Sequence, residues 1–550
     1  MRRDPNRSTR ARRAVVLVAL LGLVAAACGD DDGSTGAEQP GGATVATTGE
    51  ARSSSSEATD VDEDGVLRVA VGLLPTNAST QWDPTTMVSP AGPTHELVYG
   101  SLLRQRPDGT VVPDLAVSAE VVDPRTVTIE LREGVVFSDG TPFDAAAVKA
   151  GIERNLSVNN QRALDAELYE VESITVDGPL SLTVHLRSPI AGSFYTLLFG
   201  RGATTIVSPK AVADGVDLAK TPVGAGPYLL ESLDPEDRMV LVKNPDYWDA
   251  EHVRIPRVEF VHAEGPEATV NALRSRTVDA SGASLTPEVV NALTGSHLRV
   301  EEQLTESTLF WGQLCKSRPP FDDVRVRMAM NLALDRDGLN QALYDGISEP
   351  MWGFWPAGSP YHDPALDGFY ERDLDRARAL LAEAGYPDGF AMEAVVPSTG
   401  GVGLIGTEII QAQFAEVGID LTIVRSSNLV QQFFVENLYP VQFFTLQNPD
   451  LKRITRTLVG NNLGNICQWN HAGLNDLVAQ LQAVPHASDE AIELWKQLDR
   501  LALEEAMNIF GIFGTYGNAW DESRLGDVDF VVTYQGIPWF DVRGAYIKEG

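Results

Sequence analysis

Cysteine is scarce in this sequence, with three residues in a chain of 550. A chain of this length can bury hydrophobic cores of its own, so a small disulfide-stapled module is excluded. Basic residues are also few: 43 Lys plus Arg stand against 76 Asp plus Glu, for a formal net charge of -33. Such a charge repels phosphate groups, which argues against a surface for nucleic acid or for an anionic membrane.

Recognised catalytic patterns are missing as well. Walker A, GxSxG and HExxH sequences do not occur, and the eight histidines have spacings that fit no metal site. Gly401–Gly406 satisfies GxGxxG, but the next strand-like segment ends in Arg425 where a ribose-binding acid would be expected. We therefore expect no metal, no cofactor and no enzyme. A secreted hydrolase is the alternative, because a sequence with so many acidic residues always contains two carboxylates that could serve as a catalytic pair.

The one long apolar run is too short for a comfortable membrane span. Ala14–Ala27 has 14 residues without a polar side chain, where a span needs about 20. It follows an arginine-rich N-terminus and ends in small residues, as a secretory signal does. Val24–Cys28 resembles a bacterial lipobox, so we predict a signal peptide over 1–27 and lipidation of Cys28. A plain secretory signal is the alternative.

The segment after the signal is acidic and poor in large apolar side chains. Residues 29–65 hold ten acidic residues and one arginine among Gly, Ser, Thr and Ala, so they cannot repay the entropy of ordering. We predict a lipid-anchored, disordered tether over 28–65. If Cys28 is lipidated, Cys315 and Cys467 are the remaining pair, and the sequence leaves a disulfide and two buried thiols equally open.

From residue 66 onward, strand-like and helix-like patterns alternate, which predicts an α/β fold. The expected strands are 67–72, 126–132, 182–187, 258–263 and 419–424. The expected helices are 142–156, 373–386, 406–418 and 489–506, several of them preceded by a capping residue. Residues 109–144 predict a strand hairpin followed by a helix in which Pro142 sets the first helical φ.

Several motifs, in order along the chain, resemble the bacterial extracellular solute-binding proteins of family 5, the peptide-binding lipoproteins of ABC importers. The matching segments are Pro113–Ala116, Asp123 with Thr126 and Thr128, Leu131–Phe143, Pro222–Tyr228, Asn244–Trp248, and Pro320–Arg327 with Asp335–Arg336. Together they extend over a large part of the chain, so chance similarity is a poor explanation.

The resemblance implies a two-lobe clamp of the periplasmic-binding-protein type (type II) with an extra domain. Domain I would comprise 66–101, 205–300 and 512–550, domain II 102–204, and domain III 301–511. A solute bound between the lobes would favour the closed state. The implied function is that of an extracytoplasmic lipoprotein that delivers a peptide or another small polar solute to an ABC permease with its ATPase. We expect a monomer, held to the membrane by its lipid anchor alone.

Aromatic side chains commonly line such clefts, so tryptophans are candidate ligand contacts. Trp82 and Trp469 are the leading candidates, because they lie near segments that resemble the family's binding segments. Trp311 and Trp520 are further candidates, ranked below these two. For each of them, an ordinary place in a hydrophobic core is the alternative.

One position departs from the pattern of the peptide binders. The resemblance implies an Asp four residues before a Pro, where it pairs with the α-ammonium group of a peptide. Counting back from Pro449 gives Thr445, whose hydroxyl cannot supply a charge-assisted hydrogen bond of about 1.5 to 3 kcal/mol. Asp450 is a substitute if the alignment slips. The change from Asp to Thr favours blocked peptides, glycosides, opines or metal chelates as ligands. Independently of the ligand, a solute receptor without a transport role is an alternative function.

Overall fold

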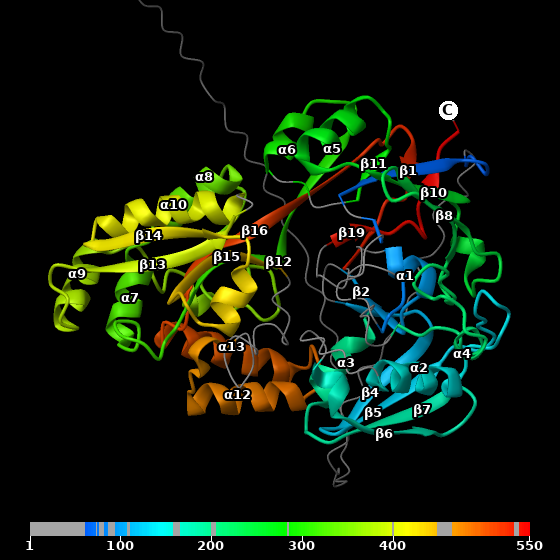
Figure 1. Ribbon diagram of the computed structural model, residues 1–550, viewed down its shortest axis with the longest axis horizontal. Coiled ribbons are helices and arrows are strands. Elements are labelled where there is room, and N and C mark those ends of the chain that lie inside the picture. The colour runs from blue at the N-terminus through cyan, green and yellow to red at the C-terminus, as the bar shows by residue number, and fades with distance from the viewer. Residues whose placement is uncertain are drawn as a thin grey trace, which may run out of the picture. The chain divides into compact units, whose positions relative to one another are not determined.

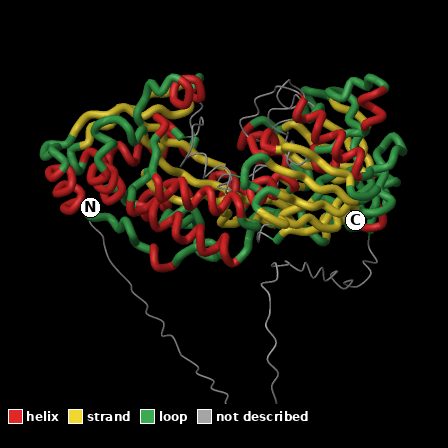
Figure 2. Tube along the Cα trace, turned by 90° about the horizontal axis from the view of Figure 1, so that it is seen from below, coloured by secondary structure: helices red, strands yellow, loops and turns green. Residues whose placement is uncertain are grey.

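The computed structural model describes most of the chain from residue 61 onward. The described residues are 61–72, 74–75, 82–85, 94–106, 110–157, 166–199, 205–282, 285, 287–398, 401–447, 465–532 and 538–549. Helices and strands are mixed along these residues (Figure 2), so the predicted α/β class is confirmed.

A ten-stranded mixed sheet is the largest element of the structure (Figure 1). Its order is β14-β13-β15-β12-β16-β11-β1-β10-β9-β8. The strands are β1 (Val66–Val71), β8 (Tyr228–Leu233), β9 (Arg238–Lys243), β10 (Arg257–His262), β11 (Ala280–Ser281), β12 (Arg299–Leu314), β13 (Phe390–Pro397), β14 (Ile419–Ser426), β15 (Val441–Gln447) and β16 (Ile509–Trp520). The strands expected near residues 67, 258 and 419 are therefore present as β1, β10 and β14.

Two long antiparallel strands, β12 and β16, join the two halves of this sheet, and we call them the crossing strands. Near one end Arg299 pairs with Trp520, next to β11, and beyond the middle β12 pairs with β15 as well. Their register slips between Leu304 and Leu309, which pair with Thr515 and Phe513. Such an irregularity disrupts the ladder and increases the local twist of the crossing strands.

A separate four-stranded antiparallel sheet has the order β4-β5-β7-β6. Its strands are β4 (Ala116–Asp123), β5 (Thr126–Leu131), β6 (Val171–Val176) and β7 (Ser181–Leu186). Val127, Ile129 and Leu131 alternate with more exposed residues, as predicted. The helix after the hairpin, α2 (Ala145–Ser157), begins later than expected, because Asp144 and not Pro142 starts it: the Asp144 carboxylate accepts a hydrogen bond from the Ala147 amide.

Two small sheets include the C-terminal segment. One has the order β19-β18-β2-β3, and the other pairs β17 with β20. Their strands are β2 (Leu103–Gln105), β3 (Val111–Pro113), β17 (Leu525–Gly526), β18 (Phe530–Val532), β19 (Pro538–Phe540) and β20 (Tyr546–Ile547). In the C-terminal segment, β18 therefore pairs with β2, which lies more than 400 residues earlier, whereas β20 pairs with the nearby β17.

The remaining helices cover the sheets. They are α1 (Thr94–Tyr99), α3 (Ala191–Tyr195), α4 (Pro209–Ala213), α5 (Gly265–Arg274), α6 (Pro287–Leu293), α7 (Val324–Leu332), α8 (Arg336–Tyr344), α9 (Leu374–Glu383), α10 (Val402–Ala415), α12 (Ala472–Ala483) and α13 (Asp489–Glu504). Short helical turns are η1 (Ala166–Glu170), η2 (Thr196–Leu198), η4 (Ala250–His252), η5 (Pro364–Leu366), η6 (Val430–Val435) and η7 (Ile466–Gln468). Asp373 and Ser488 cap α9 and α13 through their side chains, as the expected helix starts require.

The carboxylate of Asp114 is fully buried and lies at the centre of a polar network. Tyr247 donates a hydrogen bond to Asp114 Oδ1 at 3.0 Å, and the indole of Trp248 donates to the same oxygen at 3.3 Å. Arg104 and Arg543 place nitrogens 3.9 and 3.6 Å from Oδ2. A buried carboxylate is stable only with such partners, so this site orders the segments that supply them.

Asp541 completes this set of residues, which we call the Asp114 network. Its carboxylate accepts hydrogen bonds from Arg104 Nη1 at 2.9 Å and Arg543 Nε at 2.8 Å. Burial alone would raise the pKa of Asp541, but Arg543 and Arg104 outweigh it and lower the pKa to about 2. The network thus ties the C-terminal segment to β2 and to the start of the hairpin predicted within residues 109–144, which we call the hallmark hairpin.

We predict that Asp114→Asn lowers the free energy of unfolding by about 3 to 5 kcal/mol, because the buried Arg543 and the half-buried Arg104 each lose one of their two counter-charges. Urea unfolding at pH 7 measures this change. Asp420→Asn, at an exposed position on β14, is the matched control and should be within about 0.5 kcal/mol of the parent protein. Equal losses in the two variants would contradict the assigned role of Asp114.

The low pKa of Asp541 predicts a defined acid sensitivity. A carboxyl group whose pKa is lowered on folding stabilises the folded state above its unfolded pKa, and this stabilisation is lost as the pH falls through the folded pKa. Between pH 4 and pH 2 the protein should lose about 2 kcal/mol through this group alone. Asp541→Asn should have a shallower stability profile over that range, and a profile parallel to that of the parent protein would argue against the prediction.

Candidate ligand-binding region

The pairing of β12 with β15 brings two of the predicted site residues close together. In register, Trp311 pairs with Phe444 and Phe310 pairs with Thr445. The Trp311 side chain is fully buried, and its ring centroid lies 6.1 Å from that of Phe444. Trp311 is therefore part of a core beneath this region, and its role as a ligand contact stays a prediction.

A disulfide closes the end of this strand pair. Cys315, directly after β12, is bonded to Cys467 in η7, with Cα atoms 5.4 Å apart across 152 residues of sequence. Of the two alternatives that the sequence left open, the structure thus shows the bridge. The hydroxyl of Ser317 donates to the Cys467 carbonyl at 3.2 Å, which further connects the two segments.

Trp469, two residues beyond Cys467, lies beside two buried cations. Its ring centroid is 5.2 Å from Lys316 Nζ and 5.9 Å from Arg327 Cζ, both within cation–π range. The ring of His471 stacks on the indole at 5.5 Å. Trp469 is half-buried, so one part of its surface remains open to solvent while the rest covers the cations.

Lys316 is unusual among the charged residues that the structure describes. It is 2% exposed, it has no carboxylate partner among the described residues, and its ammonium donates one long hydrogen bond, 3.5 Å, to the Leu314 carbonyl. Burial lowers the pKa of Lys316 to about 7, and the nearby Arg327 contributes to the same decrease. Near neutral pH this group therefore switches between a charged and a neutral form.

Arg327, in contrast, is well satisfied. Its guanidinium donates to the carbonyl oxygens of Glu505 and Phe321 at 2.7 and 2.8 Å, and it lies 3.6 Å from the Glu505 carboxylate. The same carboxylate is 3.8 Å from His471 Nε2. Arg327 thus fixes the C-terminal end of α13 against α7.

Trp82, one of the two leading candidates, lies in the core. It is fully buried, its ring centroid is 4.7 Å from that of His95, and its carbonyl accepts a hydrogen bond from the Tyr99 hydroxyl at 2.8 Å. Next to it, Asp83 forms a two-pronged ion pair with Arg154 of α2 at 2.9 and 2.8 Å. In this structure the indole presents no surface to a solute, and its role in binding stays a prediction.

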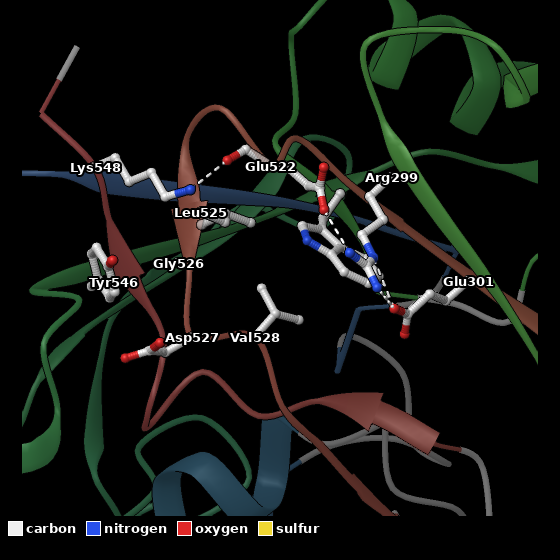
Figure 3. Close-up of a pocket in the computed structure, with 10 residues that line it drawn as sticks. Arg299, Glu301, Glu522, Leu525, Gly526, Asp527, Val528, Tyr546 and Lys548 are labelled. Atoms are coloured by element: carbon white, nitrogen blue, oxygen red, sulfur yellow. Dashed lines mark hydrogen bonds and ion pairs between the residues drawn. The ribbon is translucent and has the colours of Figure 1, made fainter. Parts of the chain in front are cut away.

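Trp520 lies at the opposite end of the crossing strands, at the edge of a polar hollow of about 580 Å³. Arg299, whose guanidinium lies 5.6 Å from the Trp520 ring, forms ion pairs with Glu301 and Glu522 (Figure 3). Trp520 itself is 6% exposed. The structure therefore separates Trp520 from Trp469, and the predicted tryptophans do not form one cluster.

Some predicted residues lie outside the described part of the chain. Cys28 and Asp450 are among them, and of Thr445 only the backbone is described. Among the residues that are described, no group of three His, Cys, Asp or Glu side chains is arranged to hold a metal ion.

The glycine-rich turn at 401–406 has a structural explanation. Gly401 precedes α10 with φ of 80°, and a Cβ on Gly406 would lie 2.4 Å from the ring of Phe310. The glycines thus allow a tight turn and close packing of α10 on β12.

Lys316 and Arg327 were missed by the sequence reasoning. Arg327 was part of a matched motif, but nothing in its spacing indicates that it caps a distant helix. Lys316 follows Cys315 in a polar stretch, and a lysine in such a stretch is expected to be solvated. Only knowledge of the Cys315–Cys467 pairing would have indicated its burial.

The fold and the arrangement of the crossing strands define the class of a two-lobe α/β binding protein. The model of the bacterial extracellular solute-binding proteins, family 5 middle region, matches residues 110–440, and the chain belongs to this family. The resemblance derived from the motifs is thus confirmed. Within the part of the chain that the structure describes, no helix has both the length and the apolar character needed to cross a membrane.

Similar proteins bind several kinds of solute. The glutathione-binding protein GsiB of Salmonella paratyphi A is 30% identical over 304 residues, which cover 55% of this chain and 58% of that protein. The ABC transporter-associated periplasmic binding protein DppA from Helicobacter pylori, solved with the peptide STSA, has a TM-score of 0.69 at 20% identity, covering 88% of this chain and 98% of that one. The murein tripeptide binding protein MppA of Escherichia coli has a TM-score of 0.70 at 18% identity, covering 90% and 100%.

Lys316 gives a prediction with an unusual sign. A lysine whose pKa is lowered on folding binds fewer protons in the folded state than in the unfolded state, so stability rises with pH above its folded pKa. Between pH 7 and pH 9.5 the free energy of unfolding should gain up to about 1.4 kcal/mol per pH unit from this group. Denaturant unfolding across this range measures the slope.

Lys316→Met should remove that slope, while Lys220→Met, at a side chain that is 82% exposed, should retain it. If Lys316→Met and the parent protein have parallel profiles, the buried ammonium is not the source of the pH dependence.

Proposed function

We propose that the protein is the extracytoplasmic substrate-binding component of an ABC importer and has no catalytic role. The observation that carries this proposal is the family match over 110–440 together with a sheet whose halves are joined by only two crossing strands. A pair of strands with a register slip allows the halves to rotate, and a solute that contacts both halves favours the closed arrangement.

For the ligand we propose a peptide or a related small polar solute. GsiB is named for glutathione, and the DppA structure contains a peptide, which supports this class without fixing the member. Trp469 is the best placed of the candidate contacts, because it is half-buried and is positioned by the disulfide and by two cations. Its indole offers the flat apolar surface on which peptide side chains pack.

We further propose that Cys28 carries a lipid and that residues 28–65 tether the folded part to the membrane, where a permease receives the solute. The lipobox-like Val24–Cys28 and the acidic, Gly- and Ser-rich composition of the tether support this arrangement. A solute receptor that signals without transport is the alternative: permease and ATPase genes next to the gene of this protein would favour transport, and their absence would favour the receptor.

A ligand panel tests the proposed function. The full chain, purified in mild detergent, would be screened by thermal shift against glutathione, tri- and tetrapeptides with free or blocked N-termini, sugars, opines and metal chelates. A solute present at 100 times its Kd should add about 2.7 kcal/mol of stability. Because Thr445 stands where a carboxylate would bind the α-ammonium group, blocked peptides or non-peptides should stabilise at least as well as free-amine peptides.

Thr445→Asp is the matched variant. It should increase the preference for free-amine over blocked peptides by roughly tenfold or more, the equivalent of one charge-assisted hydrogen bond. A parent protein that already binds only free-amine peptides would show that Asp450 or another acid replaces the missing group. Absence of any stabilisation across the panel would reject the proposed ligand class.

A further inference from the structure

Helices α3 and α12 connect the four-stranded sheet to the helices beside the large sheet, in addition to the connection that the crossing strands make. Helix α3 packs on β4 and β5 of the four-stranded sheet, whereas α12 packs on α13 beside the β15 half of the large sheet. The two helices contact each other. In Figure 1 they meet in the lower part of the molecule, well away from the labels of β12 and β16.

The contact depends on a glycine. A Cβ added to Gly192 would lie 1.8 Å from the carbonyl oxygen of Val484, 2.8 Å from its carbonyl carbon and 3.2 Å from the Gln482 oxygen. Val484 is the C-cap residue of α12. No side chain larger than hydrogen fits between the two backbones, so α3 and α12 approach this closely only because residue 192 is glycine.

The three atoms nearest to that hypothetical Cβ all belong to Gln482 or Val484. No atom of the four-stranded sheet on which α3 packs lies as close to that Cβ position, so the sheet does not require a glycine there. Within a helix, alanine is more favourable than glycine. The need for glycine at this position thus arises from the contact with α12.

Aromatic rings flank the glycine contact. Phe199, just after η2, lies 5.3 Å from Tyr195 of α3 and 6.3 Å from the ring of His486, which follows α12. The ring centroid of His486 also lies 6.0 Å from that of Tyr361. Phe199 and Tyr361 are both buried. Ring contacts thus continue from α3 across to Tyr361 on the other side of the contact, and they add buried apolar area to it.

We propose that the α3–α12 contact belongs to the closed arrangement, and that Gly192, by permitting this contact, sets the affinity of the protein for its solute without touching it. This inference rests on the proposed function. A solute binds the closed arrangement, so its apparent Kd equals the intrinsic Kd divided by the closed fraction. Any side chain at position 192 reduces that fraction and weakens binding, although the ligand contacts remain intact.

Gly192→Ala and Gly192→Leu test the proposal as a graded pair, because both residues favour helices and differ in size. Two quantities are measured on the full chain: the affinity for glutathione by calorimetry and the radius of gyration by small-angle X-ray scattering, without and with glutathione. We expect roughly tenfold weaker binding for Ala, a larger loss for Leu, and a larger ligand-free radius in both. Both variants should still unfold in a cooperative transition, which distinguishes loss of the contact from a failure to fold.

Gly544→Ala and Gly544→Leu are the controls, because a Cβ at this exposed glycine meets no atom within 4 Å. They should leave both the affinity and the radius unchanged. Equal ligand-free radii for the parent protein and Gly192→Leu would overturn the proposal, whatever the affinity for glutathione. If the parent protein binds no member of the ligand panel while the radii differ as expected, the contact stands and the proposed function fails.

Discussion

The buried carboxylate of Asp114 is the constraint on which the rest of the structure depends. A charge in that position requires partners, and they come from β2, from the Tyr247–Trp248 pair and from the C-terminal Arg543. Three of the family motifs meet here: Asp114 comes from the first, Tyr247 and Trp248 from another, and Arg132 of the hallmark hairpin donates to the Asp114 carbonyl at 2.9 Å. These three motifs thus build a buried polar scaffold.

A rigid scaffold of this kind makes the few weak connections important. The crossing strands lose register between Leu304 and Leu309, and the α3–α12 contact depends on a single glycine. Neither connection involves the Asp114 network. If the lobes close on a solute as proposed, substitutions at Gly192 should change the free energy of closing without changing this scaffold.

Much of the fold follows from the sequence, because its cause is local. Val127, Ile129 and Leu131 alternate with polar residues, and the structure has β5 at that place. Pairings between distant segments have no local cause. The 152-residue separation of Cys315 and Cys467 gives no indication of their contact, and so the burial of Lys316 was not foreseen. Trp82 and Trp469 share a residue type, yet one lies in a core and the other is half-buried, because burial is decided by tertiary packing.

Hydrogen exchange at single amides, measured with and without the panel solute that stabilises the protein most, tests the central claim directly. The account predicts that the solute slows exchange in β12, β16, α3 and α12, while amides around Asp114 and Tyr247 are already slow and change little. A uniform slowing across the whole chain, or protection confined to the Asp114 network, would contradict closure about the crossing strands.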